Sequence, residues 1–165
     1  MGKTQLSVHY VQRFGDRYSL VFWLNAKSEG TLKAGMVEIA MQTMEDPVSG
    51  NVTNAQEEER MVRQAREWLS RRGNEGWLLV YDNYDDPRLP GIDSSTGYDI
   101  RNFFPKRAQG STLITTRSQQ LVFGKKLLLQ KLDDVDQSLT ILATRSGRKV
   151  KGGEALFILR GGGSD

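Results

Sequence analysis

The sequence predicts an α/β domain with a mainly parallel sheet. Apolar stretches of strand length alternate with longer segments in which apolar residues recur at helical spacing. The 165 residues, 38% hydrophobic and 26% charged, have the composition of a globular protein and suffice for about one domain. Strands that are separated by helices pair in parallel through crossover connections, so this alternation favours a parallel sheet.

The first part of the chain predicts a helix, a strand and a second helix. Residues 3–14 carry apolar side chains at helical spacing, and Gly15 closes the segment. Residues 18–25 (YSLVFWLN) form an apolar run rich in aromatic and β-branched residues, which is typical of a buried strand. Ser28 then offers a capping hydroxyl for a helix that runs to about residue 44.

A third helix and the most informative strand follow. After loop-forming residues at 45–54, residues 55–71 have an amphipathic pattern. Its expected core face consists of Met61, Val62, Ala65, Trp68 and Leu69. Residues 77–83 (WLLVYDN) then form a hydrophobic run of strand length that ends in a carboxylate and an amide.

The last part of the chain predicts shorter elements. A helical stretch is expected near residues 98–104, followed by strands at 111–116 (STLITT) and 126–130 (KLLLQ). Residues 133–142 have acidic residues early and apolar ones later, as a helix N-terminus does. The tail, residues 149–165, ends in GGGSD, and this composition predicts a mobile segment.

Composition and charge exclude several classes of function. The chain has no cysteine and a single histidine, His9, so disulfides and Cys-based zinc sites are excluded and a metal must bind through oxygen. The net charge of +3 comes from interleaved acidic and basic residues, which argues against a nucleic-acid partner. No apolar run reaches the roughly 20 residues of a membrane span, and no signal peptide opens the sequence, so a cytoplasmic protein without a membrane partner is expected.

We interpret the tryptophan residues and the single histidine as structural residues. Trp23, Trp68 and Trp77 fall on apolar patterns, which predicts packing in the core or at an interface. His9 lies beside Tyr10 in the first helix without an evident triad, so no catalytic role is assigned to it.

The first candidate binding motif is Gly2-Lys3-Thr4 at the start of a helix. It is the second half of the phosphate-loop pattern G-x-x-x-x-G-K-[ST], in which backbone amides and the lysine hold phosphates and the hydroxyl reaches Mg²⁺. Taken alone, the triplet carries little weight, and an ordinary helix start is the favoured interpretation.

Two further residues end predicted strands. Asp82 follows the buried run WLLVY, where α/β sheets place ligands and where ATPases place the Walker B carboxylate. A core strand that ends in a turn-forming Asp-Asn pair is the alternative. Arg117 follows STLITT and would present a guanidinium to a terminal phosphate at the same edge; the alternative is a surface charge.

The order and spacing of these motifs resemble the NB-ARC family of STAND-class P-loop NTPases. The segments GKTQL, VFWLNA, WLLVYDN, GSTLITTRS and LLLQKLDD carry the resemblance over about residues 2–148, and DDPRLPG and GYDIRNFFP are similar to fungal NLR-like members. The resemblance implies a P-loop NTPase three-layer sandwich. It also implies a partial nucleotide-binding domain at residues 1–148 and a flexible tail outside the family pattern at 149–165.

The resemblance also implies ligands and a function. ADP or ATP would be bound by Gly2, Lys3, Thr4, Gln5, Asp82 and Arg117, with Mg²⁺ on Thr4 and Asp82. Lys3 would contact the β- and γ-phosphates, and Arg117 would act as the sensor arginine. The implied function is a nucleotide-dependent switch in innate-immunity signal transduction, in which the chain would associate with homotypic or related NB-ARC proteins.

Two departures from the family pattern change the expected activity. Asn83 stands where many ATPases place a carboxylate that activates water, so hydrolysis should be slow or absent and no catalytic residue is assigned. Asp85 and Asp86 are expected to be loop caps, with a displaced base as the alternative.

The second departure is that the glycine-rich half of the phosphate loop and the strand before it, which is central in the family's sheet, are not in the sequence. Two unpaired inner edges are expected, and the alternative function is a non-binding remnant or adaptor that acts through protein contacts.

Overall fold

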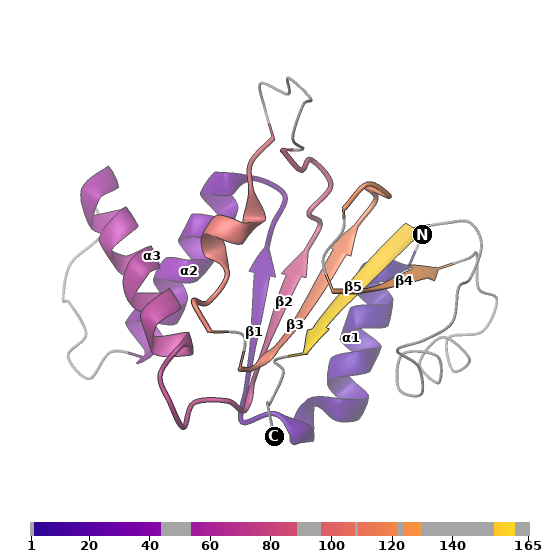
Figure 1. Cartoon of the computed structure of the whole chain (residues 1–165), viewed down its shortest axis with the longest axis horizontal. Coiled ribbons are helices and arrows are strands. Elements are labelled where there is room, and N and C mark those ends of the chain that lie inside the picture. Colours follow the sequence, from indigo (N-terminus) through magenta and orange to yellow (C-terminus); the bar gives the residue numbers. More distant parts are fainter. Residues whose placement is uncertain are drawn as a thin grey trace.

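The computed structural model describes residues 2–43, 54–88, 97–107, 109–121, 124–129 and 154–160, and it has helices on both faces of a five-stranded sheet (Figure 1). The helices are α1 (Lys3–Phe14), α2 (Glu29–Thr43) and α3 (Ala55–Leu69). The strands are β1 (Leu20–Asn25), β2 (Trp77–Asp82), β3 (Ser111–Thr116), β4 (Lys125–Leu129) and β5 (Glu154–Arg160). Short 3₁₀ turns occur at Gly15–Arg17 and Ile100–Phe103.

Most predicted elements are confirmed to within a few residues. The predicted capping by Ser28 is confirmed, because its Oγ accepts a hydrogen bond from the backbone N–H of Thr31 at 3.2 Å. The stretch predicted to be helical near residues 98–104 is a 3₁₀ turn. The helix predicted at residues 133–142 lies outside the described residues.

The sheet has the order β1-β2-β3-β5-β4. β1, β2 and β3 are parallel, as predicted, with Trp23 opposite Val80 and Val80 opposite Leu113. All six residues of β2 are buried, because helices cover both faces of the sheet and strands flank both edges of β2. This three-stranded parallel sheet confirms the α/β class.

The prediction of a mobile tail with two unpaired inner edges is wrong for residues 154–160. These residues form β5, which lies between β3 and β4 and runs antiparallel to both. The segment EALFILR contains five consecutive apolar residues, enough for a strand, although glycines surround it. An interior strand edge without a partner leaves backbone amides and carbonyls unsatisfied, and this cost favours pairing over a free tail.

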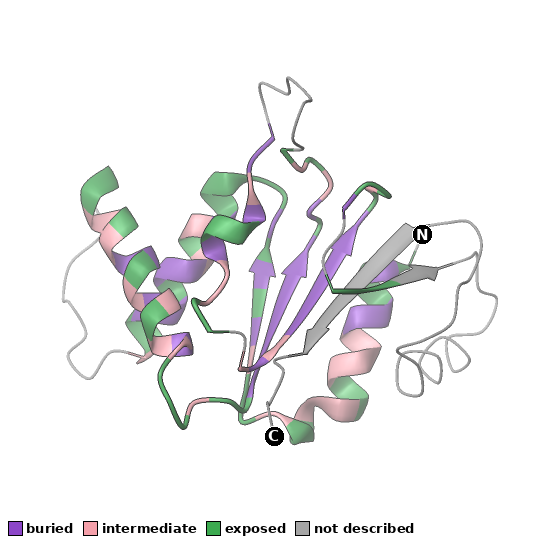
Figure 2. Cartoon of the chain, in the orientation of Figure 1, coloured by how far each residue is buried: buried purple, intermediate pink, exposed green. Residues whose placement is uncertain are grey.

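The two faces of the sheet carry separate apolar clusters (Figure 2). α2 and α3 cover the larger cluster, in which Leu32, Met36, Met61 and Leu69 are at most 1% exposed. The predicted core face of α3 is confirmed, with Trp68 packed against this cluster while partly exposed. α1 covers the smaller cluster of Leu6, Leu78, Val80 and Leu113.

Three buried tyrosines fix the connection between β2 and β3. Tyr98 donates its hydroxyl to the carbonyl of Ala26 at 2.7 Å, and Tyr84 donates to the carbonyl of Tyr98 at 2.7 Å. Tyr81 donates to the carbonyl of Phe103 at 3.1 Å. Burial raises the pKa of Tyr81, Tyr84 and Tyr98, so these phenols remain neutral donors at physiological pH.

The tryptophans divide into two kinds. Trp77 is buried as predicted and donates its indole N–H to the carbonyl of Leu69 at 3.0 Å. Trp23 is 39% exposed on β1, so of its two predicted roles packing in the core is wrong, and packing at an interface stays a prediction. β1 is an edge strand, and the face of β1 that carries Trp23 is less covered than the face that carries Phe22 and Leu24.

Within the described part of the chain, no helix is both long and apolar enough to cross a bilayer.

Candidate functional site

The residues predicted to bind nucleotide meet at one edge of the sheet. β1, β2 and β3 are parallel, so their carboxyl ends lie at the same edge, with Asn25 opposite Asp82 and Tyr81 opposite Ile114. α1 begins at this edge too, because Thr4 in its first turn contacts Asp82. Ligands bind to α/β sheets at this edge.

Asp82 is the centre of the site. Its side chain is 5% exposed at the end of β2. It accepts hydrogen bonds from Thr4 Oγ1 at 3.0 Å to Oδ1 and 3.1 Å to Oδ2, and from Thr115 Oγ1 at 2.6 Å to Oδ1. A buried carboxylate needs such donors, because burial without them costs several kcal/mol. The carboxylate therefore joins the first turn of α1 to the ends of β2 and β3.

Thr115 is a site residue that the sequence reasoning missed. Its hydroxyl accepts the backbone N–H of Asn83 at 2.9 Å and donates to Asp82, and the residue is fully buried. The available signal was a polar side chain near the end of an otherwise apolar strand, on the same face as Leu113. Such a side chain needs a polar partner, and only the strand pairing shows that the partner is Asp82.

The identity of Asn83 has a conformational reason. Its φ is 67°, in the left-handed region where Asn and Asp are several-fold enriched. This turn allows the chain to leave β2 while the N–H of Tyr84 still bonds to the carbonyl of Thr115 at 2.9 Å. Asn83 is therefore a turn residue that follows β2, and its side chain is exposed.

Lys3 and its neighbours form the start of α1. Lys3 is 7% exposed, whereas Gly2 and Gln5 are exposed. Gly2, the N-cap, has a φ of 134° and supplies no side-chain cap to the helix. Backbone amides in the first turn of a helix carry a partial positive charge, which favours an anion there. The edge therefore joins an amide-rich helix start, a lysine and a buried carboxylate.

Arg117 lies at the same edge but is held by Asp85. The Arg117 side chain is 72% exposed, and its Nε lies 3.3 Å from Asp85 Oδ2. The backbone N–H of Arg117 also donates to Asp85 Oδ1 at 2.7 Å. This contact confirms the prediction that Asp85 caps the loop. The described contacts of the Arg117 side chain are thus with the loop after β2.

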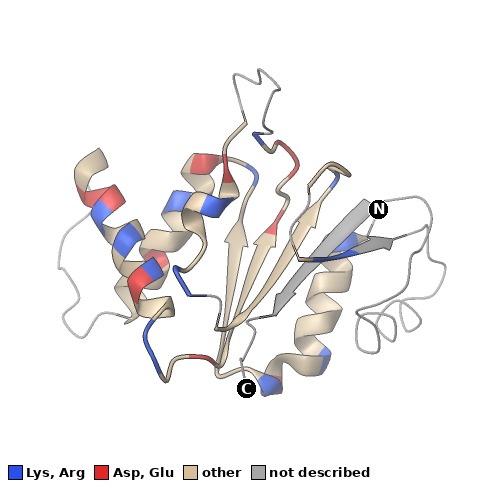
Figure 3. Cartoon of the chain, viewed as in Figure 1, with Lys and Arg blue, Asp and Glu red and all other residues tan. Residues whose placement is uncertain are grey.

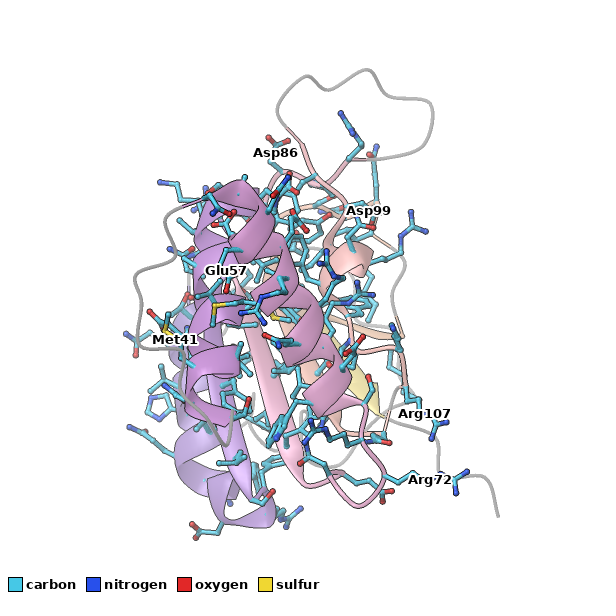
Figure 4. All side chains as sticks on the ribbon, turned by 90° about the vertical axis from the view of Figure 1, so that its left-hand side faces the viewer. Met41, Glu57, Arg72, Asp86, Asp99 and Arg107 are labelled. Carbon is cyan, nitrogen blue, oxygen red and sulfur yellow. The ribbon has the colours of Figure 1, made fainter. Side chains whose placement is uncertain are left out.

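The charges at this edge bear on which ligand it fits. Figure 3 shows acidic residues at the end of β2 and in the segment that follows it, and Figure 4 places Asp86 and Asp99 at the opposite end of the molecule from Arg72 and Arg107. Hydrogen bonds from Arg101 lower the pKa of Asp99, which keeps that carboxylate charged. Among the residues predicted to bind nucleotide, the groups that could attract an anion are Lys3, the α1 amides and Arg117.

The site offers two oxygen-bearing side chains to a metal ion. Within the described residues, no group of three acidic, histidine or cysteine side chains could enclose an ion. Thr4 and Asp82 instead offer one hydroxyl and one carboxylate. Mg²⁺ is commonly held by one or two carboxylates together with substrate phosphates, so these donors fit a magnesium ion that arrives with phosphate.

Comparisons with protein-family models, with curated proteins and with solved structures give no match, so what this edge binds is inferred from its own residues.

Proposed function

We propose that the chain is the ADP/ATP-binding part of a P-loop NTPase switch of the NB-ARC type. One observation supports this most: the hydroxyl of Thr4, in the predicted phosphate-loop half, donates to Asp82, the predicted Walker B carboxylate, across 78 positions of sequence. Two residues expected to share one magnesium ion are therefore adjacent. A chance GKT triplet would have no reason to lie beside this carboxylate.

Each residue of the edge would have a distinct part in binding. Lys3 would neutralise phosphate charge, the first amides of α1 from Gly2 to Gln5 would donate to phosphate oxygens, and Thr4 and Asp82 would hold Mg²⁺. When bound, the metal would offset the charge of the phosphates. Thr115 keeps Asp82 oriented by its hydrogen bond at 2.6 Å.

Slow or absent hydrolysis is part of the proposal. Asn83 carries an amide where a general base is expected, and an amide does not accept a proton at neutral pH. Asp85 is engaged by the backbone and side chain of Arg117, which supports its role as a loop cap rather than a base. A protein that binds nucleotide without rapid turnover suits a switch, because the bound nucleotide then sets its state.

The test is titration with fluorescent ADP and Mg²⁺ of the unmodified chain, Lys3→Ala and Lys27→Ala. Lys27 is an exposed lysine that follows β1 at the same edge, so its variant controls for the loss of any one positive charge. We expect saturable binding that weakens at least about tenfold in Lys3→Ala, since a charge-assisted hydrogen bond contributes about 1.5–3 kcal/mol. Lys27→Ala should bind within about twofold of the unmodified chain.

Thermal melts of all three proteins accompany the titration. Equal affinities in the two variants, or no saturable binding by a cooperatively melting protein, would show that this edge is not a phosphate site and would leave the adaptor alternative.

A further inference from the structure

β5 holds an unusual position among the described strands. It lies inside the sheet, between β3 and β4, and it runs in the direction opposite to the other four described strands (Figure 1). Its register pairs Ser111 with Arg160 on one side and Lys125 with Ile158 on the other. The segment therefore satisfies the backbone groups of two strands at once.

β3 and β4 both depend on this strand. In the described part of the chain, no ladder joins β3 to β4, so β4 belongs to the sheet through β5. Residues Thr112–Thr116 of β3 are buried, and β5 covers one of the two edges of that strand. Without β5, β3 and β4 would each present an unpaired edge, and such edges recruit other strands.

The connection that precedes β5 is long enough for this strand to reach a second molecule. It is the last described strand, and residues 130–153 separate it from β4 along the sequence. At roughly 3.3 Å per residue, that connection spans at most about 80 Å, which is more than the width of a domain of this size. A copy of Glu154–Arg160 from another molecule would meet the same edges in the same register.

We propose that the position between β3 and β4 is a strand-acceptor site, and that it takes Glu154–Arg160 from a second copy of this chain to form a strand-exchanged dimer. The partner is a second copy because an identical segment forms every ladder hydrogen bond that β5 forms within one chain. The strand-exchanged dimer and the monomer that keeps its own β5 therefore differ little in free energy per strand. A tethered segment has an effective concentration of about millimolar, so exchange is favoured when chains fold at high concentration.

Disulfide cross-linking can test this proposal, because the chain has no cysteine and only introduced cysteines can form a disulfide. Ser111 and Arg160 are register partners. Directly opposite residues in an antiparallel pair have Cα atoms about 4.5–5.5 Å apart, which a disulfide spans. A double variant, Ser111→Cys with Arg160→Cys, reports whether β5 occupies the position. Two single variants, one with a mass tag, report exchange when they are unfolded, refolded together and oxidised.

In the matched control for the mixed single variants, Arg63→Cys takes the place of Ser111→Cys. Arg63 is exposed on α3 and is not paired with β5. The unmodified chain is refolded in parallel over a hundredfold range of concentration, and its mass is measured by light scattering. This second measurement does not depend on any substitution.

Three results are expected. The double variant links within one chain at low concentration, the mixed single variants form tagged-to-untagged dimers at least fivefold above the control, and the unmodified chain doubles in mass as concentration rises. If the double variant does not form the disulfide, β5 does not occupy the position between β3 and β4, and the proposal is overturned. Monomeric unmodified chain at every concentration, or linked dimers no more abundant than in the control, overturns exchange. ADP binding is measured separately, so either idea can fail alone.

Discussion

The face of the sheet that packs against α2 and α3 differs from the face that packs against α1 in size and chemistry. Among the described residues, the first face carries a buried apolar cluster of 21 residues, and the second a cluster of four, Leu6, Leu78, Val80 and Leu113. The second face instead carries Thr4, Asp82 and Thr115, joined by hydrogen bonds.

This difference separates the face that contributes most of the stability from the face that carries the proposed binding site. Apolar burial contributes roughly 25 cal/mol per Å², so the larger cluster dominates the free energy of unfolding. The α1 face buries a carboxylate, which needs donors and adds little net stability. A site with costly polar groups is tolerated because the opposite face holds β2 in place.

The largest expected effect comes from emptying the large cluster. Leu79 on β2 is fully buried against α2 and α3, so Leu79→Ala should lower the free energy of unfolding by about 2–5 kcal/mol. Urea denaturation measures the loss. Leu20→Ala, at a 41% exposed position on β1, is the control and should cost less than about 1 kcal/mol. Equal losses in the two variants would contradict the conclusion that burial in the large cluster dominates the free energy of unfolding.

Overpacking the same cluster is the second prediction. A Cβ added at Gly110 would lie 2.3 Å from the ring of Trp77, whose side chain is 1% exposed. Gly110→Ala should therefore cost about 1–3 kcal/mol, because the buried ring must shift.

Gly30→Ala is the matched control, since an added Cβ there meets nothing within 4 Å and lies in α2. It should leave the melting temperature unchanged or raise it, as alanine favours a helix. A Gly110→Ala protein as stable as the control would mean that the Trp77 packing is loose.

The third prediction concerns the α1 face. Thr4→Val removes the hydroxyl that donates to Asp82, so stability should fall by about 1–2 kcal/mol and the Mg²⁺-dependent part of nucleotide affinity should be lost. Thermal melts and ADP titrations with and without Mg²⁺ measure the two effects. Ser7→Ala is the control on the same helix, because Ser7 bonds to the carbonyl of Lys3 rather than to Asp82. A Mg²⁺ response that survives in Thr4→Val would argue against the magnesium assignment.

The smallest effect is expected at Asp85. Asp85→Asn keeps an oxygen for the backbone N–H of Arg117 and removes the exposed ion pair, so stability should change by less than about 1 kcal/mol. If Arg117 contacts a terminal phosphate, its release from the carboxylate should raise the affinity for ATP relative to ADP by about two- to threefold. Competition of ATP with fluorescent ADP gives this ratio, and Arg117→Ala should abolish the gain. An unchanged ratio in Asp85→Asn would remove Arg117 from the proposed site.

Local patterns predicted much of the fold and part of the site. The helices α1, α2 and α3 and the strands β1 to β4 follow from apolar spacing and capping residues, which act over a few positions. Asp82 was predicted because it ends a buried strand at the edge where α/β sheets place ligands. These inferences needed neighbouring residues only.

Tertiary structure decided what depends on distant segments. Thr115 became a site residue through the pairing of β2 with β3, and Arg117 contacts Asp85 across 32 positions. Trp23 is exposed because it lies on the less covered face of the edge strand β1. The sequence by itself determined the α/β class, the elements up to β4 and the candidate pair Thr4 and Asp82. Only the folded sheet placed Glu154–Arg160 between β3 and β4, because the need to satisfy the edges of β3 and β4 is a property of the assembled strands.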